Sequence, residues 1–227
     1  MSLADILVLA LLGGVLGLDT VSFPQAMLSR PIVAGTLAGA FLGAAPMGLL
    51  LGATLELFAV ETLPFGASRY PEWGSSSVVG AALYVGASSA PPGALATSVL
   101  ATLLVAWIGG WTMVQLRKLN AHWARQRHDA VARGSRRVVV GLQLAGLTAD
   151  LLRGAVLTGA GLFALHPLQQ IVIGTWTGRA ELSRAVVAAT AAAVTLGAAY
   201  KLFHAVPGFH WQFTLGIAAG LAAVVIL

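Results

Sequence analysis

Apolar runs separated by short polar or proline-containing breaks fill almost the whole chain, and they constrain its fold more than any other feature. Charged residues make up only 9% of the 227 residues, whereas about a quarter of a soluble domain is charged. So few charges cannot cover the surface of a soluble protein of this length. The sequence therefore predicts an all-α integral membrane protein, a polytopic helix bundle with apolar runs at 3–18, 31–44, 46–63, 75–89, 93–116, 138–165, 184–206 and 209–227.

The early runs are shorter than the later ones. A helix needs about 20 residues to cross a hydrocarbon core of about 30 Å, and most runs after residue 92 reach that length. The run 31–44 would cover only about 21 Å as a helix. Because backbone inside a membrane must be hydrogen-bonded within the protein, short broken segments fit best around a cavity. We expect one membrane domain, 1–227, with broken or re-entrant segments and the substrate site in 1–91, and longer spanning helices in 92–227.

Basic residues concentrate in one segment, 117–137, which holds seven of the 13 Lys and Arg residues and a single acid, Asp129. A loop of this kind between apolar runs is the positive-inside signal, so we place it in the cytoplasm. It can fix topology alone, or it can also dock a cytoplasmic partner. Because the charge has this location, the pI of about 10.5 does not indicate nucleic-acid binding.

Besides Asp5 near the start of the chain, four of the eight acidic residues lie in or between the early apolar runs: Asp19, Glu56, Glu61 and Glu72. An ionisable group at the bilayer centre costs on the order of 3 kcal/mol, so each needs a partner, a cavity or an interfacial position. Glu56 is in mid-run, which favours a functional role over a structural ion pair, whereas Glu61 near a run end can be interfacial and Glu72 can be a plain loop residue. The candidate substrate-binding residues are Glu56, Glu72, Asp19, Glu61 and Arg69.

Buried carboxylates suit two kinds of chemistry. Each carboxylate accepts several hydroxyl hydrogen bonds, which fits a neutral polyhydroxylated ligand. Coupling to protons or cations is the rival use of a carboxylate inside a membrane. The residues alone leave both possibilities open.

No motif for catalysis or for a cofactor is present. Cysteine is absent, which excludes disulfides and thiolate metal sites, and the five histidines form no metal-binding pair. Gly-x-Ser-x-Gly, His-Glu-x-x-His and the phosphate-binding P-loop do not occur. We therefore expect no catalytic residue, no metal and no cofactor in this chain.

The segment 17–72 resembles the enzyme IIC subunit, the permease, of the mannose/fructose/sorbose phosphotransferase system. The order and spacing of its features carry the resemblance over about 55 residues. The Pro-acid pair is usually Pro-Asp in that family, and here it is Pro-Glu, with a side chain one methylene longer. The shared features are Asp19, Arg30–Pro31, Leu42–Gly43, "GATLEL" from Gly52 to Leu57, Gly66–Ala67 and Pro71–Glu72.

This resemblance implies a multi-pass subunit of the bacterial inner membrane that binds a hexose-type sugar and carries it inward. It implies a membrane IID partner and cytoplasmic IIA and IIB subunits, which relay phosphate on histidines, so this chain needs no phosphohistidine of its own. An oligomer within the lipid bilayer is expected. Glu56 and Glu72 would line the sugar site, with Glu61 nearby. The alternative is a non-transporting scaffold or regulatory relative that has lost the sugar site.

Overall fold

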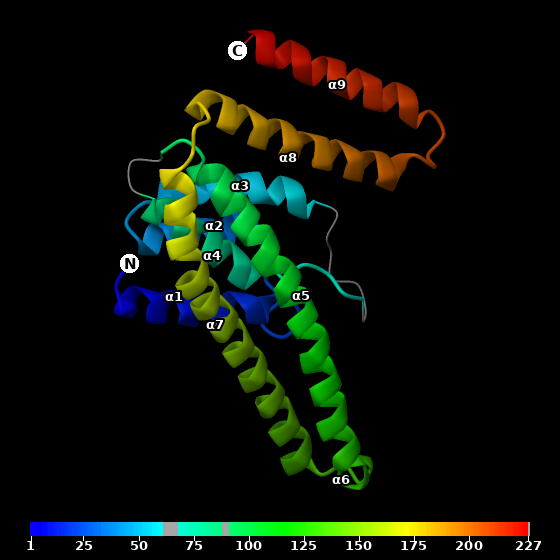
Figure 1. Cartoon of the computed structure of the whole chain (residues 1–227). Helices are drawn as coiled ribbons and strands as arrows, with labels where there is room; N and C mark the ends of the chain where they lie inside the picture. Colours follow the sequence, from blue (N-terminus) through cyan, green and yellow to red (C-terminus); the bar gives the residue numbers. More distant parts are fainter. Residues whose placement is uncertain (61–67, 88–90, 227) are drawn as a thin grey trace.

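A computed structural model describes residues 1–60, 68–87 and 91–226, and these residues form helices joined by turns, with no strand among them. The predicted all-helical membrane fold is confirmed, because α5, α7 and α8 are each long and apolar enough to cross a membrane. Figure 1 shows the arrangement of α1 (Leu3–Asp19), α2 (Pro31–Phe41), α3 (Ala45–Ala59), α4 (Trp73–Gly86), α5 (Ala94–Gln126), α6 (His128–Ala132), α7 (Arg136–Gly174), α8 (Ala180–Phe203) and α9 (Phe209–Ile226).

The short helices α2 and α3 form a tight antiparallel hairpin. Each begins with a proline in its first turn, where the missing N–H costs nothing. The chain reverses at Gly43, whose φ of +75° is accessible to glycine without strain. A Cβ atom on Gly39 would lie only 2.7 Å from the Cα of Gly48, so the two backbones are in contact. With 11 and 15 residues, these helices are the short, broken segments predicted for the N-terminal third.

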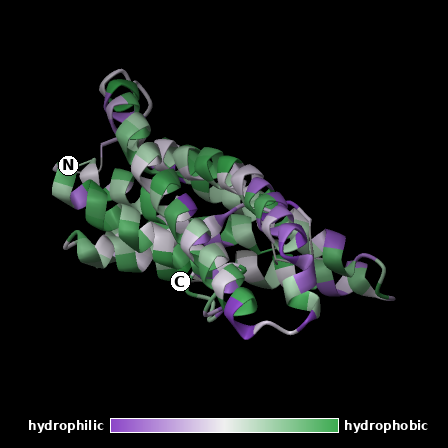
Figure 2. Ribbon diagram, turned by 90° about the horizontal axis from the view of Figure 1, so that it is seen from below, coloured by the Kyte–Doolittle hydropathy of each residue, from purple (hydrophilic) through white to green (hydrophobic). Residues whose placement is uncertain are grey.

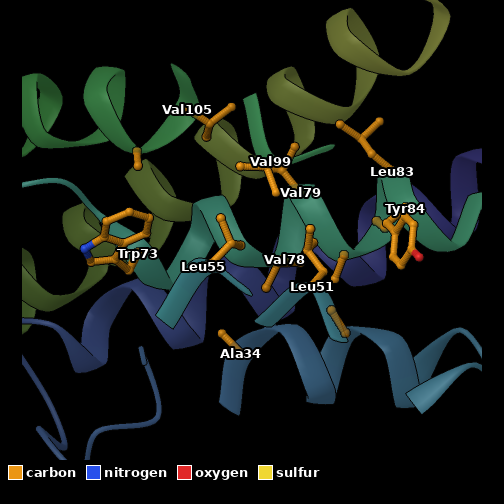
Figure 3. Close-up of a cluster of buried hydrophobic side chains, with 14 of the residues drawn as sticks. Ala34, Leu51, Leu55, Trp73, Val78, Val79, Leu83, Tyr84, Val99 and Val105 are labelled. Carbon is orange, nitrogen blue, oxygen red and sulfur yellow. The ribbon is translucent and has the colours of Figure 1, made fainter. Parts of the chain in front are cut away.

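The central helix of the fold is α4, whose residues are buried without a break from Trp73 to Tyr84. It contacts α1, α2, α3, α5 and α7. Figure 3 shows its apolar side chains Val78 and Val79 between those of α3 and α5. Its buried serines need internal partners, and Ser75 donates to the Gly13 carbonyl of α1 at 2.9 Å. This packing fixes the start of α4 in the middle of the molecule.

The longest helices, α5 and α7, run antiparallel and meet at the short α6 (Figure 1). The segment 117–137, expected as a loop, is helical over most of its length. Residues 116–126 contain good helix formers and neither Pro nor Gly, so α5 continues to Gln126. With 33 and 39 residues, the two helices are about 50 and 58 Å long. Both therefore extend beyond a hydrocarbon core of about 30 Å.

The last two helices, α8 and α9, lie along one edge of the molecule (Figure 1). α8 contacts α3 and α5, and the Thr195 hydroxyl donates to the Leu57 carbonyl of α3 at 2.9 Å. Large apolar side chains on both helices are exposed, among them Leu182 and Trp211. Figure 2 shows that most helices consist mainly of hydrophobic residues, and that hydrophilic residues are concentrated in one part of the view. An apolar exterior of this kind is suited to lipid.

Candidate functional site

A cavity of about 260 Å³ lies where α1 ends and α4 begins. Its walls come from two non-helical segments, the connection between α1 and α2 and the residues that precede α4. Such irregular backbone inside a membrane protein is characteristic of substrate sites. The cavity is lined by Asp19, Thr20, Val21, Gln25, Met27, Ser29, Arg30, Tyr70, Pro71 and Trp73.

Asp19 shapes the connection between α1 and α2. Its Oδ1 accepts a hydrogen bond from the backbone N–H of Ala26 at 2.6 Å, and its Oδ2 accepts from the backbone N–H and the hydroxyl of Ser29 at 2.8 and 3.0 Å. These bonds close the connection, residues 20–30, into a compact loop in which Gln25 and Met27 have positive φ values. This segment is called the cavity loop below. Such conformations persist only where surrounding contacts hold them. Asp19 is thus buried beside the cavity, with both oxygens engaged by the loop.

The cavity carries hydrogen-bonding groups beside two aromatic rings. The Thr20 hydroxyl is buried and has no hydrogen-bond partner among the described residues. Tyr70 receives a hydrogen bond from Arg117, whose guanidinium also lies 5.1 Å from the centre of its ring. Burial raises the pKa of the Tyr70 hydroxyl, and the Arg117 charge opposes that shift. The phenol therefore keeps its proton at neutral pH and can donate it. Trp73 completes the aromatic wall.

Arg30 connects the cavity wall to Glu56. Its Nε donates to Glu56 Oε1 at 2.6 Å, and its Nη2 forms an ion pair with the same oxygen. The second carboxylate oxygen accepts from the backbone N–H of Ile32 at 3.1 Å, so it satisfies one of the free N–H groups at the start of α2. Glu56 does not line the cavity itself. It holds the arginine that does.

Glu72 lies between two cavity residues and is only 1% exposed. As the N-cap of α4, it accepts a hydrogen bond through Oε1 from the backbone N–H of Ser75 at 3.1 Å. Its Oε2 is buried and has no hydrogen-bond partner in the described part of the chain. An unpaired buried polar atom costs about 1–3 kcal/mol. Glu72 thus lies beside the cavity without lining it, with one oxygen that caps α4 and one that is buried without a partner.

A buried ion pair on α7 contacts the connection between α1 and α2 that forms one wall of the cavity. Asp150 is 1% exposed, and its Oδ1 lies 2.9 Å from both Nε and Nη2 of Arg153. Its Oδ2 accepts a hydrogen bond of 2.5 Å from the hydroxyl of Ser22, in the cavity loop. Arg153 also donates to the Thr112 hydroxyl of α5 at 3.3 Å. The pair therefore ties the loop to both long helices.

Asp150 and Arg153 were not among the residues selected from the sequence. The signal that would have found them is the one that singled out Glu56, an ionisable residue inside an apolar run. Within "LTADLLRGAV" the two are three residues apart. On a helix this spacing places them on one face.

The other predicted residues have different surroundings. Arg69 is exposed and contacts α5. Its guanidinium donates to the Trp107 carbonyl at 3.1 Å and lies 4.8 Å from the centre of the Trp107 indole ring. It does not line the cavity. Glu61 lies outside the described residues. The structure thus places Asp19 in the cavity wall and Glu72 beside it, and Glu56 is connected to the wall through Arg30. Their part in substrate binding stays a prediction.

The chemistry of the cavity suits a neutral ligand rich in hydroxyl groups. The lining combines two hydroxyls, an amide, a guanidinium and a phenol, which together donate and accept hydrogen bonds. The one arginine in the lining is neutralised by Glu56, and the one carboxylate is engaged by backbone N–H groups. Aromatic faces beside such groups fit the apolar faces of a polyol ring.

Two comparisons of the sequence with known proteins find relatives. A family model described as "PTS system sorbose-specific IIC component" matches residues 3–199. A fructose permease IIC component of Bacillus subtilis (strain 168) is 33% identical over 85 residues, an alignment that covers 37% of this chain and 31% of that protein. The chain thus aligns with less than a third of the length of this relative.

Two solved structures share the fold. One, described only as a membrane protein, has a TM-score of 0.76 and 16% sequence identity, over 100% of this chain and 94% of the other. The second belongs to the complex of the mannose transporter ManYZ with microcin E492 (MceA), with a TM-score of 0.64 and 16% identity, over 100% and 95% of the two chains. At this identity the likeness shows a common architecture.

Proposed function

Because the chain belongs to the family of PTS sorbose-specific IIC components, we propose that it is the membrane subunit that binds a hexose-type sugar and carries it across the membrane. The sugar would be phosphorylated by cytoplasmic partner subunits as it arrives. The cavity between the end of α1 and the start of α4 is proposed as part of the sugar site. Glu72 and the residues of the cavity loop would form its polar contacts.

One observation carries this proposal. Two buried oxygens, Thr20 Oγ1 in the cavity lining and Glu72 Oε2 beside it, have no hydrogen-bond partner among the described residues. Buried polar groups are almost always paired in folded proteins, and an unpaired one lowers stability. Sugar hydroxyls would supply the missing partners. A carboxylate that accepts a hydroxyl hydrogen bond forms the stronger, charge-assisted kind.

The proposed assembly follows from the family. We place the chain in the bacterial inner membrane with a IID subunit beside it and IIA and IIB subunits on the cytoplasmic side. The apolar exposed faces of α8 and α9 are compatible with lipid and with a membrane partner. The scaffold alternative is less favoured, because the family model that matches residues 3–199 describes a IIC component of a phosphotransferase system.

Thr20→Val tests the proposal because it removes the hydroxyl without breaking any hydrogen bond in the described protein. We expect binding of the preferred hexose to weaken by about five- to tenfold, the effect of one neutral hydrogen bond. The melting temperature should stay constant or rise. The measurement is equilibrium binding of mannose, fructose and sorbose to the full chain, purified with its IID partner.

Thr36→Val is the matched control, since the Thr36 hydroxyl donates to the Ile32 carbonyl within α2 and does not line the cavity. It should bind sugar normally. Unchanged binding in Thr20→Val would place the sugar elsewhere. Failure of the native complex to bind any hexose would favour the scaffold alternative.

A further inference from the structure

A second cavity, of about 460 Å³, lies at the far end of the α5–α7 hairpin, well apart in sequence from the residues of the proposed sugar site. Its lining has two different walls. One is basic and polar, with Arg127 and Arg137 beside Gln126 and the indole of Trp123. The other is apolar and follows α7, through Val138, Gly141, Leu142 and Ala145.

The positive charge in this groove is not neutralised by the protein. Neither Arg127 nor Arg137 forms a side-chain hydrogen bond or an ion pair with the described residues, and no acidic side chain is in the lining. The single acid nearby, Asp129, is exposed and lies 3.4 Å from His128. Two unpaired guanidinium groups that line one groove will attract an anion, and a phosphate matches their fork geometry.

The position of the groove indicates where that anion comes from. The α5–α7 hairpin is longer than the hydrocarbon core is thick, so its tip reaches the headgroup region. Beside the groove, α7 exposes Val139, Val140 and Leu144, which is the surface of a helix in contact with lipid. Tryptophan and arginine next to such a surface are typical of the membrane–water boundary.

We propose that this groove binds an anionic phospholipid, with the headgroup phosphate between Arg127 and Arg137 and an acyl chain along the apolar wall of α7. Basic pockets between membrane helices at this depth have the chemistry to select such headgroups. A free phosphate would use the arginines but not the apolar wall. A bound lipid would join the two long helices at the tip of their hairpin.

The test counts lipids bound to the full chain by native mass spectrometry, with dioleoyl phosphatidylglycerol and dioleoyl phosphatidylcholine as probes. We expect the native protein to prefer the anionic lipid. Arg127→Gln with Arg137→Gln should weaken binding of phosphatidylglycerol about tenfold, because each cation near an anionic headgroup contributes a several-fold factor. The control, Arg133→Gln with Arg136→Gln, removes the same charge from the same segment outside the groove and should bind as the native protein does.

Gly141→Leu tests the apolar wall. A Cβ atom on Gly141 meets no other atom within 4 Å, so a side chain fits without strain and enters the groove. Binding of phosphatidylglycerol should fall while the melting temperature is kept. Gly197→Leu, at an equally open glycine of α8, should have no effect. Melting temperatures of all four variants check that they are folded.

Two outcomes would overturn the proposal. If Arg127→Gln with Arg137→Gln keeps the native preference for phosphatidylglycerol, the arginines do not bind lipid, and a soluble acidic partner becomes the better occupant. If millimolar inorganic phosphate displaces phosphatidylglycerol and Gly141→Leu changes nothing, the groove binds phosphate alone.

Discussion

Arg30 and Glu56 join the start of α2 to the last turn of α3, through two contacts between one guanidinium and one carboxylate oxygen. The other oxygen of Glu56 holds the backbone of Ile32. Because Arg30 also lines the cavity, this pair connects the shape of the proposed sugar site to the packing of the α2–α3 hairpin. A change at Glu56 will therefore affect both.

The pair should show energetic coupling. Glu56→Gln and Arg30→Gln should each lower the free energy of unfolding by about 1–3 kcal/mol, since each leaves a half-buried partner unpaired. The double variant should lose less than the sum of the two. Thermal unfolding of the four proteins in detergent measures the coupling. Strictly additive losses would show that the two residues act independently.

Glu72→Gln tests whether Glu72 contributes to sugar binding or only to the stability of the fold. The amide oxygen can still accept the hydrogen bond from Ser75 at the start of α4, so the melting temperature should change little. Sugar binding should weaken about ten- to a hundredfold, because a charge-assisted hydrogen bond is lost. Asp5→Asn, in the exposed capping box of α1, is the control and should bind normally. Normal binding combined with early melting would make Glu72 a structural residue only.

The ion pair on α7 should be strongly stabilising as a pair. Asp150→Asn leaves Arg153 without its carboxylate in a buried position, and removing one partner of such a pair costs about 3–5 kcal/mol. Ser22→Ala loses only one hydrogen bond to Asp150 and should cost about 1 kcal/mol. Unfolding in denaturant measures both losses. Asp150→Asn with Arg153→Gln should recover part of the stability, and no recovery would contradict the pairing.

The topology can be tested because the chain has no cysteine. A single cysteine at Ala121 or Ala130, within the basic segment, should resist an impermeant thiol reagent added outside intact cells. The reason is that the basic segment is expected on the cytoplasmic side. The same cysteines should react once the cells are permeabilised. Labelling before permeabilisation would show that the basic segment lies outside the cytoplasm.

Much of the fold could be predicted from local patterns. The apolar runs marked by Pro31 and Pro46 gave the starts of α2 and α3 within one residue, because proline favours the first turn of a helix. The ends were harder to predict. Pro167 lies inside α7, which continues to Gly174, and polar residues extend α5 to Gln126. Hydropathy indicates where lipid ends, whereas a helix ends where its backbone changes direction.

The candidate site was predictable only in part. Intramembrane charge identified Glu56 and Glu72, and neither lines the cavity: Glu56 is paired with the lining residue Arg30, and Glu72 lies between the lining residues Pro71 and Trp73. The sequence could not show that Glu56 is paired with Arg30, since the contact depends on how α2 folds back on α3. Nor could it bring Ser22 to Asp150, 128 residues later in the chain. Such contacts arise from tertiary packing, which no local pattern contains.

The continuous burial of α4 from Trp73 to Tyr84 has a consequence for how the protein is made. The helix has only 14 residues and contains three consecutive serines, so it is a poor substrate for independent insertion into the bilayer. Two of its neighbours, α5 and α7, leave the ribosome after it. The start of α4, with Glu72, therefore cannot take its final place until α7 has been synthesised. Truncation before α7 should therefore leave this segment without part of the protein surface that buries it.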